Sequence, residues 1–242
     1  MTICGAALVE PTMRSKLWVA LLLVVGAGCA SGPRQPPGQP PNPSSVTVAD
    51  PGGDAHDPHR AALERQVREP WGHRNDKDDQ VHVPLPDGQH WKRVRFFGVD
   101  HFTGFRYGDD HHAVAVLLVR DAPKKDEPPT SDSCLRDFER WARLQVRAYG
   151  VRLGPIGRRD SSWREQPLTI GYVDGEVDWA FSKKRFSAAW AAYAAYPAAC
   201  LVYAMAAKWE EQPELARRVR DRWVQEGFER MAPLTETKPI RK

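Results

Sequence analysis

The stretch His112–Arg120 reads His-Ala-Val-Ala-Val-Leu-Leu-Val-Arg and is nearly continuous in apolar side chains. A run of this kind is typical of a strand at the centre of a sheet. Two further strands are indicated just before it, over 91–99 and 102–107, and Gly108-Asp109-Asp110 supplies the next turn. Because consecutive strands joined by tight turns pair side by side, the pattern predicts an antiparallel meander.

An amphipathic helix is predicted over Cys134–Tyr149. Its apolar residues return at helical spacing and fall near one face: Leu135, Phe138, Trp141, Ala142, Val146 and Tyr149. Ser131, Asp132 and Ser133 can each cap its start. Gly150 ends it, since glycine accepts the positive φ that follows a helix.

More strands are predicted after this helix. Val151–Arg158 forms one, and Pro167–Val173 and Glu176–Ser182 flank Asp174-Gly175, a strong hairpin signal. The stretch Ala188–Ala207 is ambiguous, because its aromatic spacing and alanines suit a helix while Pro197 would break one. We favour two strands that turn at Pro197.

The last predicted element is a helix that Gln212 caps and Pro213 opens. Its apolar face contains Leu215, Ala216, Val219, Trp223, Phe228 and Met231. Its outer face carries Arg217, Arg218, Arg220 and Arg222, which by default form a solvated surface. Pro233 ends the helix.

The order strands, helix, strands, helix predicts an α+β fold, an antiparallel sheet with two main helices packed against it. We place this domain at 84–233, after a short helix and polar loop over 59–83 in which Gly72–Asp79 is loop. The basic tail 234–242 is predicted to be disordered.

The segment Met13–Cys29 has the parts of a signal peptide. Arg14 and Lys16 are positive, Leu17–Val25 is apolar, and Gly26-Ala27-Gly28 are small. The apolar run is too short to cross a hydrocarbon core, which takes about 20 residues. We therefore expect residues 1–28 to be cleaved, with translation beginning at Met13.

Cys29 after these small residues resembles the lipobox of bacterial lipoproteins. The resemblance implies that its thiol receives a diacylglyceryl group and that its new amine is acylated, as with palmitate. Ala30 and Ser31 imply the outer membrane of the cell envelope. Gly26 departs from the usual leucine, and the alternative is an ordinary secretory signal with a chance cysteine.

Residues 29–58 are rich in proline, glycine and serine and have too little apolar surface to offset the entropy of ordering. Such a disordered linker is extended and semi-rigid, at about 3.1 Å per residue. It is predicted to hold the domain away from the membrane.

The element order over Leu85–Met231 loosely resembles the PsbP-like α/β/α sandwich, whose members are extrinsic accessory subunits and lipoproteins of membrane complexes. The resemblance lies in the arrangement of elements and not in a sequence motif. It implies a non-enzymatic accessory role and transfers no site residues.

Cys134 and Cys200 are the two cysteines of the predicted domain, and they form an even pair in an oxidising compartment. They suit either a disulfide, which stabilises by about 2–4 kcal/mol, or two separate buried thiols.

His101, Asp110 and His112 cluster around one predicted hairpin, and imidazole and carboxylate are metal ligands. A second cluster, His56, Asp57 and His59, lies beside the linker. The alternative for both is a set of solvated polar residues, and we expect no metal and no cofactor.

The sequence has no Gly-x-Ser-x-Gly or Ser-x-x-Lys motif for nucleophilic catalysis, no glycine-rich phosphate loop and no His-Glu-x-x-His zinc-protease motif. Asp174, Glu176 and Asp178 share a strand face and suggest either paired carboxylates for glycosidic chemistry or solvated charges. A net charge of +4 with 27% charged residues is a mixed surface and predicts no nucleic-acid partner.

Two functions follow from these patterns. The first is a lipid-anchored envelope lipoprotein that binds another envelope protein or cell-wall component and catalyses nothing. The alternative is a cell-wall-directed enzyme or metal-dependent binder that uses His101, Asp110 and His112. The first is favoured.

Overall fold

The computed structural model describes residues 57–76, 81–94, 102–123, 127–148, 150–179 and 182–233. The predicted signal peptide with Cys29, almost all of the predicted linker, His101 and the tail 234–242 lie outside these ranges. The fold is α+β, as the order of predicted elements indicated.

An antiparallel sheet of eight strands forms the middle of the molecule, in the order β3-β4-β5-β10-β9-β8-β6, with β7 paired to β8. The strands are β3 (Trp91–Val94), β4 (Phe102–Tyr107), β5 (Ala113–Asp121), β6 (Val151–Leu153), β7 (Gly157–Trp163), β8 (Gln166–Trp179), β9 (Ser182–Tyr196) and β10 (Ala199–Lys208). β5 is central, as its apolar sequence predicted. β9 and β10 turn at Pro197, which confirms the favoured assignment of this stretch.

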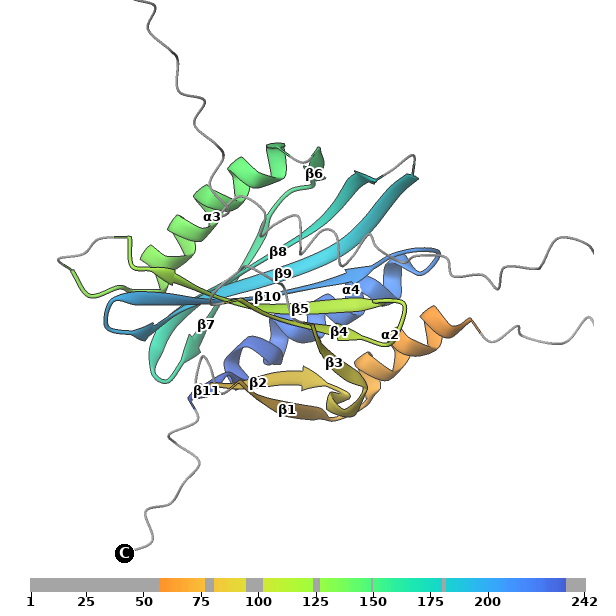
Figure 1. Cartoon of the computed structure of the whole chain (residues 1–242), viewed down its shortest axis with the longest axis horizontal. Helices are drawn as coiled ribbons and strands as arrows, with labels where there is room; N and C mark the ends of the chain where they lie inside the picture. Colours follow the sequence, from red (N-terminus) through yellow and green to blue (C-terminus); the bar gives the residue numbers. More distant parts are fainter. Residues whose placement is uncertain are drawn as a thin grey trace, which may run out of the picture.

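Helices cover both faces of the large sheet (Figure 1). α3 (Ser131–Ala148) lies on one face. On the other lie α2 (Pro58–Arg68), α4 (Pro213–Arg222) and a small sheet of β1 (Trp71–Asp76), β2 (Val81–Pro86) and β11 (Ala232–Pro233). Each face has its own hydrophobic core, so the sheet separates two cores in a three-layer sandwich.

α3 confirms the predicted helix but is capped by a different residue. The Ser133 amide donates to the Thr130 hydroxyl at 3.1 Å, and the Thr130 amide donates to the Ser133 hydroxyl at 3.0 Å. This reciprocal pair has the form of a capping box. Thr130, and none of the three residues named from the sequence, therefore caps the helix.

The core beneath α4 is aromatic. The fully buried ring of Trp223 contacts Trp91, Tyr203 and Phe228 at centroid distances of 5.2 to 6.2 Å. The predicted single helix changes form at this point, because a π turn over Trp223–Gly227 and a 3-10 turn over Phe228–Arg230 follow α4.

Three sequence-based boundaries are corrected. Gly72–Asp79 was predicted to be loop, yet Trp71–Asp76 is the strand β1, paired along its length with β2. The predicted strand Val151–Arg158 is two strands, β6 and β7, since Pro155 lies between them and has no amide to donate to a ladder.

The predicted turn at Asp174-Gly175 is the third correction. β8 runs through it without a break and pairs with β9 from Ile170 to Trp179. A Cβ atom on Gly175 would lie 2.6 Å from the Phe186 ring, so the glycine provides space for that ring and makes no turn. β8 instead forms a hairpin with each neighbour. It turns from β7 at Arg164 and Glu165, which both have positive φ, and it pairs with β9 as far as Trp179 and Ser182.

Candidate functional site: an apolar pocket beneath helix α3

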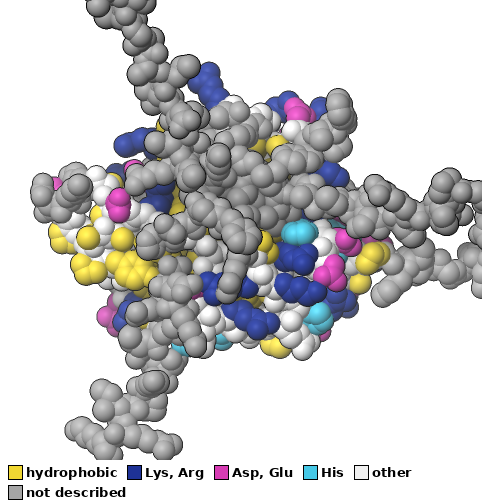
Figure 2. Space-filling model, in the orientation of Figure 1, with side chains coloured by type: hydrophobic (Ala, Val, Ile, Leu, Met, Phe, Trp, Pro, Cys, Tyr) yellow, Lys and Arg dark blue, Asp and Glu magenta, His cyan; other side chains and the backbone are white. Residues whose placement is uncertain are grey.

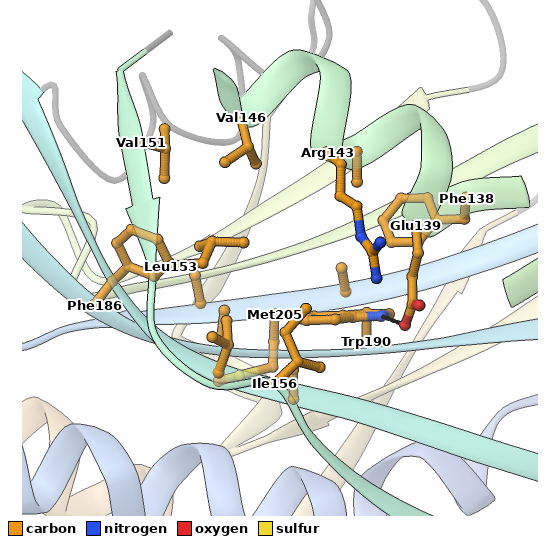
Figure 3. Close-up of a pocket in the computed structure, with 16 residues that line it drawn as sticks. Phe138, Glu139, Arg143, Val146, Val151, Leu153, Ile156, Phe186, Trp190 and Met205 are labelled. Carbon is orange, nitrogen blue, oxygen red and sulfur yellow. Dashed lines mark hydrogen bonds between the residues drawn. The ribbon is translucent and has the colours of Figure 1, made fainter. Parts of the chain in front are cut away.

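A pocket lies between α3 and the large sheet, with a cavity volume of about 50 Å³ (Figure 3). Its walls come from α3, from β6 and the segment after it, and from three neighbouring strands of the sheet. The apolar residues among them include Phe138, Ala142, Val146, Val151, Leu153, Ile156, Val173, Phe186, Ala188, Trp190, Ala204 and Ala206.

Small side chains on the sheet create this space. Ala188 of β9 and Ala204 and Ala206 of β10 face α3, and an alanine methyl group cannot reach the helix across the gap between the layers. Phe186 and Trp190 stand on either side of Ala188 along β9 and form the walls. The alternation of small and large residues therefore leaves a hollow in an otherwise packed interface.

Glu139 is the acidic group of the pocket and is 7% exposed. Its carboxylate accepts hydrogen bonds from the Arg158 guanidinium at 2.6 Å and from the Trp190 indole at 3.1 Å. Figure 3 shows the indole bond closing one end of the pocket. Because both donors are in place, this buried charge is compensated, as a buried carboxylate requires.

Arg143 lies one turn along α3 from Glu139 and also lines the pocket. Its side chain reaches from the helix toward the sheet, on the same side of the pocket as Glu139 and Trp190 (Figure 3). The residue is exposed, so it marks where the pocket meets solvent. Within the described part of the chain it has neither an ion pair nor a side-chain hydrogen bond.

Two of the three candidate metal ligands named from the sequence, Asp110 and His112, lie within the described residues. His101 is outside the described ranges. The Asp110 carbonyl accepts a hydrogen bond from the Lys208 ammonium at 2.6 Å. His112 is 7% exposed, and its Nδ1 lies 2.8 Å from Nδ1 of His59. Across the residues that the structure describes, no group of three or more His, Cys, Asp or Glu side chains could hold a metal ion.

The pairing of His59 with His112 was missed, because the sequence placed these residues in separate clusters 53 positions apart. Burial and the neighbouring His59 ring lower the pKa of His112. Nε2 of His59 also lies 3.2 Å from the Lys208 carbonyl. The pair therefore joins the start of α2 to the ends of β5 and β10.

The acidic face of β8 is paired with arginine. Arg152 contacts Glu176 at 2.6 Å and Asp178 at 3.2 Å. Asp174 accepts from Arg217 at 2.8 Å and from Arg220 at 2.6 Å. Arg220 is 9% exposed, so it is not part of a solvated helix face as predicted. These ion pairs leave the three carboxylates bound within the fold.

The two cysteines of the domain are bonded to each other, with their Cα atoms 5.5 Å apart. The bond connects the first turn of α3 to β10, on the side of the sheet that carries the pocket. It therefore attaches the helix that covers the pocket to the sheet beneath it.

The visible surface is mixed in charge. Figure 2 shows Lys and Arg side chains over the part of this face that β3, β4 and α2 occupy, with acidic and histidine side chains close by. Among the described residues, Leu144 of α3 is the one large hydrophobic side chain that is exposed. No helix in the described ranges combines the length and apolar character needed to cross a membrane.

Comparison with known proteins finds no matching family and no matching curated protein. Solved structures match in fold. The Saccharomyces cerevisiae Ran-binding protein Mog1p is 8% identical, with 69% of this chain and 96% of that chain covered and a TM-score of 0.47. Cyanobacterial PsbP from Synechocystis is 10% identical, with coverage of 67% and 92% and a TM-score of 0.43.

LpqN, involved in cell envelope biogenesis of Mycobacterium tuberculosis, is 12% identical, with coverage of 63% and 88% and a TM-score of 0.38. The neighbours thus include a PsbP-type protein. They are not a basis for assigning an activity, substrate or partner to this chain.

Proposed function

We propose that this chain is an envelope lipoprotein, anchored through Cys29 in the outer membrane, whose α+β domain is a non-enzymatic binding module. Its binding site is the pocket beneath α3, where it takes an apolar group of another envelope component. The observation that supports this proposal is a preformed hollow lined by apolar side chains from several strands and one helix. Concave apolar sites with few polar groups are the usual form of small-ligand sites.

The polar groups of the site support binding over chemistry. Glu139 is held by two donors, which leaves its carboxylate little freedom to accept a proton from a substrate. His112, one of the three candidate metal ligands, does not line the pocket, and its Nδ1 lies 2.8 Å from Nδ1 of His59. The pocket as described can select a ligand by shape and charge.

The anchor is tested separately from the pocket. Cells that express the full chain are labelled with palmitate and fractionated, beside cells that express Cys29→Ser. Two or more acyl chains give stable membrane attachment, so we expect label and sedimentation with the envelope for the parent chain only. A Cys29→Ser chain that still sediments with the envelope would show that the anchor is not this cysteine.

The binding site is tested by crosslinking in intact cells. A photoreactive amino acid replaces Ile156, which is half-buried and lines the pocket, or Arg60, which is exposed on α2 in the opposite layer. We expect the first position to capture a defined envelope component and the second not to. Adding Ala142→Leu, which fills the pocket, is expected to abolish the capture. The same capture from both positions, or capture that survives Ala142→Leu, would contradict the site.

A further inference from the structure

Arg143 is a cation without an ion-pair or hydrogen-bond partner among the residues that the structure describes. It borders an apolar pocket, and its only acidic neighbour on that wall is Glu139. That carboxylate is already engaged by Arg158 and Trp190. Arg152, Arg158, Arg217 and Arg220 each pair with a carboxylate, whereas Arg143 has no such partner among the described residues.

The size of the hollow limits what can enter it. A water-sized group needs roughly 10–15 Å³ of such space. A volume of about 50 Å³ therefore holds a few groups in a row and is too small for a ring system. A flexible alkyl chain end fits such a space, because each methylene is narrow and its burial away from water is favourable.

We propose that the pocket binds the chain end of a single-chain amphiphile whose anionic head group, a carboxylate or a phosphate, pairs with Arg143 at the mouth. This inference rests on the proposed function, in which the pocket is the binding site, and adds the class of ligand. The apolar walls receive the alkyl chain, and the guanidinium fork matches the two oxygens of the head group. Glu139, held inside the fold, repels a head group that tries to enter further.

The neighbouring arginines supply a matched control. Arg147 lies one turn beyond Arg143 on α3, is exposed, and does not line the pocket. Arg147→Gln and Arg143→Gln remove the same charge from the same helix. A difference between the two variants therefore reports the position of the charge at the pocket and not the net charge of the protein.

The experiment measures binding to the full chain carrying Cys29→Ser, which keeps the protein's own acyl groups out of the assay. The probes are hexanoate, hexyl phosphate, hexanol and hexyltrimethylammonium, whose short chains allow the chain end to enter the hollow while the head group stays at its mouth. The signal is tryptophan fluorescence, since Trp190 lines the pocket. Arg143→Gln, Arg147→Gln and Ala142→Leu are compared with the parent, after circular dichroism shows that each is folded.

We expect the two anionic probes to bind more tightly than hexanol, and the cationic probe to bind weakest. Arg143→Gln is expected to weaken the binding of the anionic probes about three- to tenfold and to leave the binding of hexanol unchanged, while Arg147→Gln changes neither. Ala142→Leu is expected to weaken the binding of all probes. A preference for hexanoate over hexyl phosphate, or the reverse, identifies the head group.

Three results would overturn this inference, and they differ in what they imply. Equal binding of all four probes, with no effect of Arg143→Gln, would reject the head-group contact and leave an apolar pocket. An equal loss with Arg147→Gln would show a general charge effect and also reject it. Absence of binding by every probe would reject both the amphiphile and the pocket as an acyl site, and crosslinking at Ile156 would then decide the proposed function.

Discussion

His112 lies just before β5 with its ring buried against the ring of His59. The 2.8 Å contact between the two Nδ1 atoms requires one nitrogen to carry a proton and the other to accept it. A pair in which both rings are fully protonated cannot keep this contact. The position of a proton therefore controls how α2 is attached to the sheet.

We predict that the protein loses stability as the pH falls below about 6.5, the ordinary value for histidine. Burial lowers the pKa of His112 in the folded state, so the unfolded chain binds more protons in this range. Stability rises with pH wherever the unfolded state binds more protons, and it is therefore complete above that value and decreases below it. Urea unfolding measured at pH 5.5 and pH 7.5 gives the difference directly.

The variant His112→Leu measures how much of this pH dependence of stability comes from His112. Burial also lowers the pKa of His73 and His111, so part of the pH dependence remains in this variant. The matched control is the variant His82→Leu, because His82 faces Asn75 at the surface. A His112→Leu variant with the same pH dependence as the parent would show that this histidine does not couple folding to pH.

At the scale of elements, β8 shows how tertiary contacts override a local signal. Asp174-Gly175 suits a tight turn, but in the fold Asp174 accepts bonds from Arg217, Arg220 and the Ser187 hydroxyl. These bonds, with Gly175 under the Phe186 ring, need an extended backbone. The strand therefore continues, and α4 is attached to it through two arginines.

We predict that Asp174→Asn destabilises the protein by roughly 1–3 kcal/mol, since hydrogen bonds to charged groups contribute about that amount. Arg220 is buried and would lose its charged acceptor. Glu176→Gln, two residues along the same strand, removes an exposed pair with Arg152 and is expected to have little effect. Chemical denaturation of both variants compares them, and equal losses would mean that the α4 contact has no special role.

For the whole molecule, the Cys134–Cys200 bond ties one layer of the sandwich to the next. It closes a loop with a sequence separation of 66 residues that contains most of α3, the β6–β9 strands and most of the residues that line the pocket. Restricting such a loop in the unfolded chain stabilises the folded state by about 4 kcal/mol in the chain-entropy estimate. The covalent link is therefore expected to keep α3 over the pocket.

We predict that Cys134→Ser combined with Cys200→Ser lowers the free energy of unfolding by about 2–4 kcal/mol. Denaturant unfolding of the parent with and without a reducing agent provides the companion measurement. The reducing agent should lower the stability of the parent and leave the double variant unchanged. A double variant as stable as the oxidised parent would show that the bond is not formed or does not restrict the chain.

Elements with strong patterns could be predicted, and weakly patterned ones could not. The apolar run of β5 and the amphipathic face of α3 were identified because burial requires their side chains to repeat at fixed spacing. β1, with the sequence Trp-Gly-His-Arg-Asn-Asp, has no such repeat, and its local pattern predicts a loop from Gly72 on. Its strand form comes from pairing with β2, which a local pattern does not contain.

The sequence alone determined the α+β class, the presence of the helix α3, the central strand and the turn at Pro197, because these depend on local spacing and on proline chemistry. Only the tertiary structure decided the pocket, the His59–His112 pair and the arginine partners of β8. The physical reason is that each joins residues from separate segments of the chain, and such contacts exist only after the layers have packed.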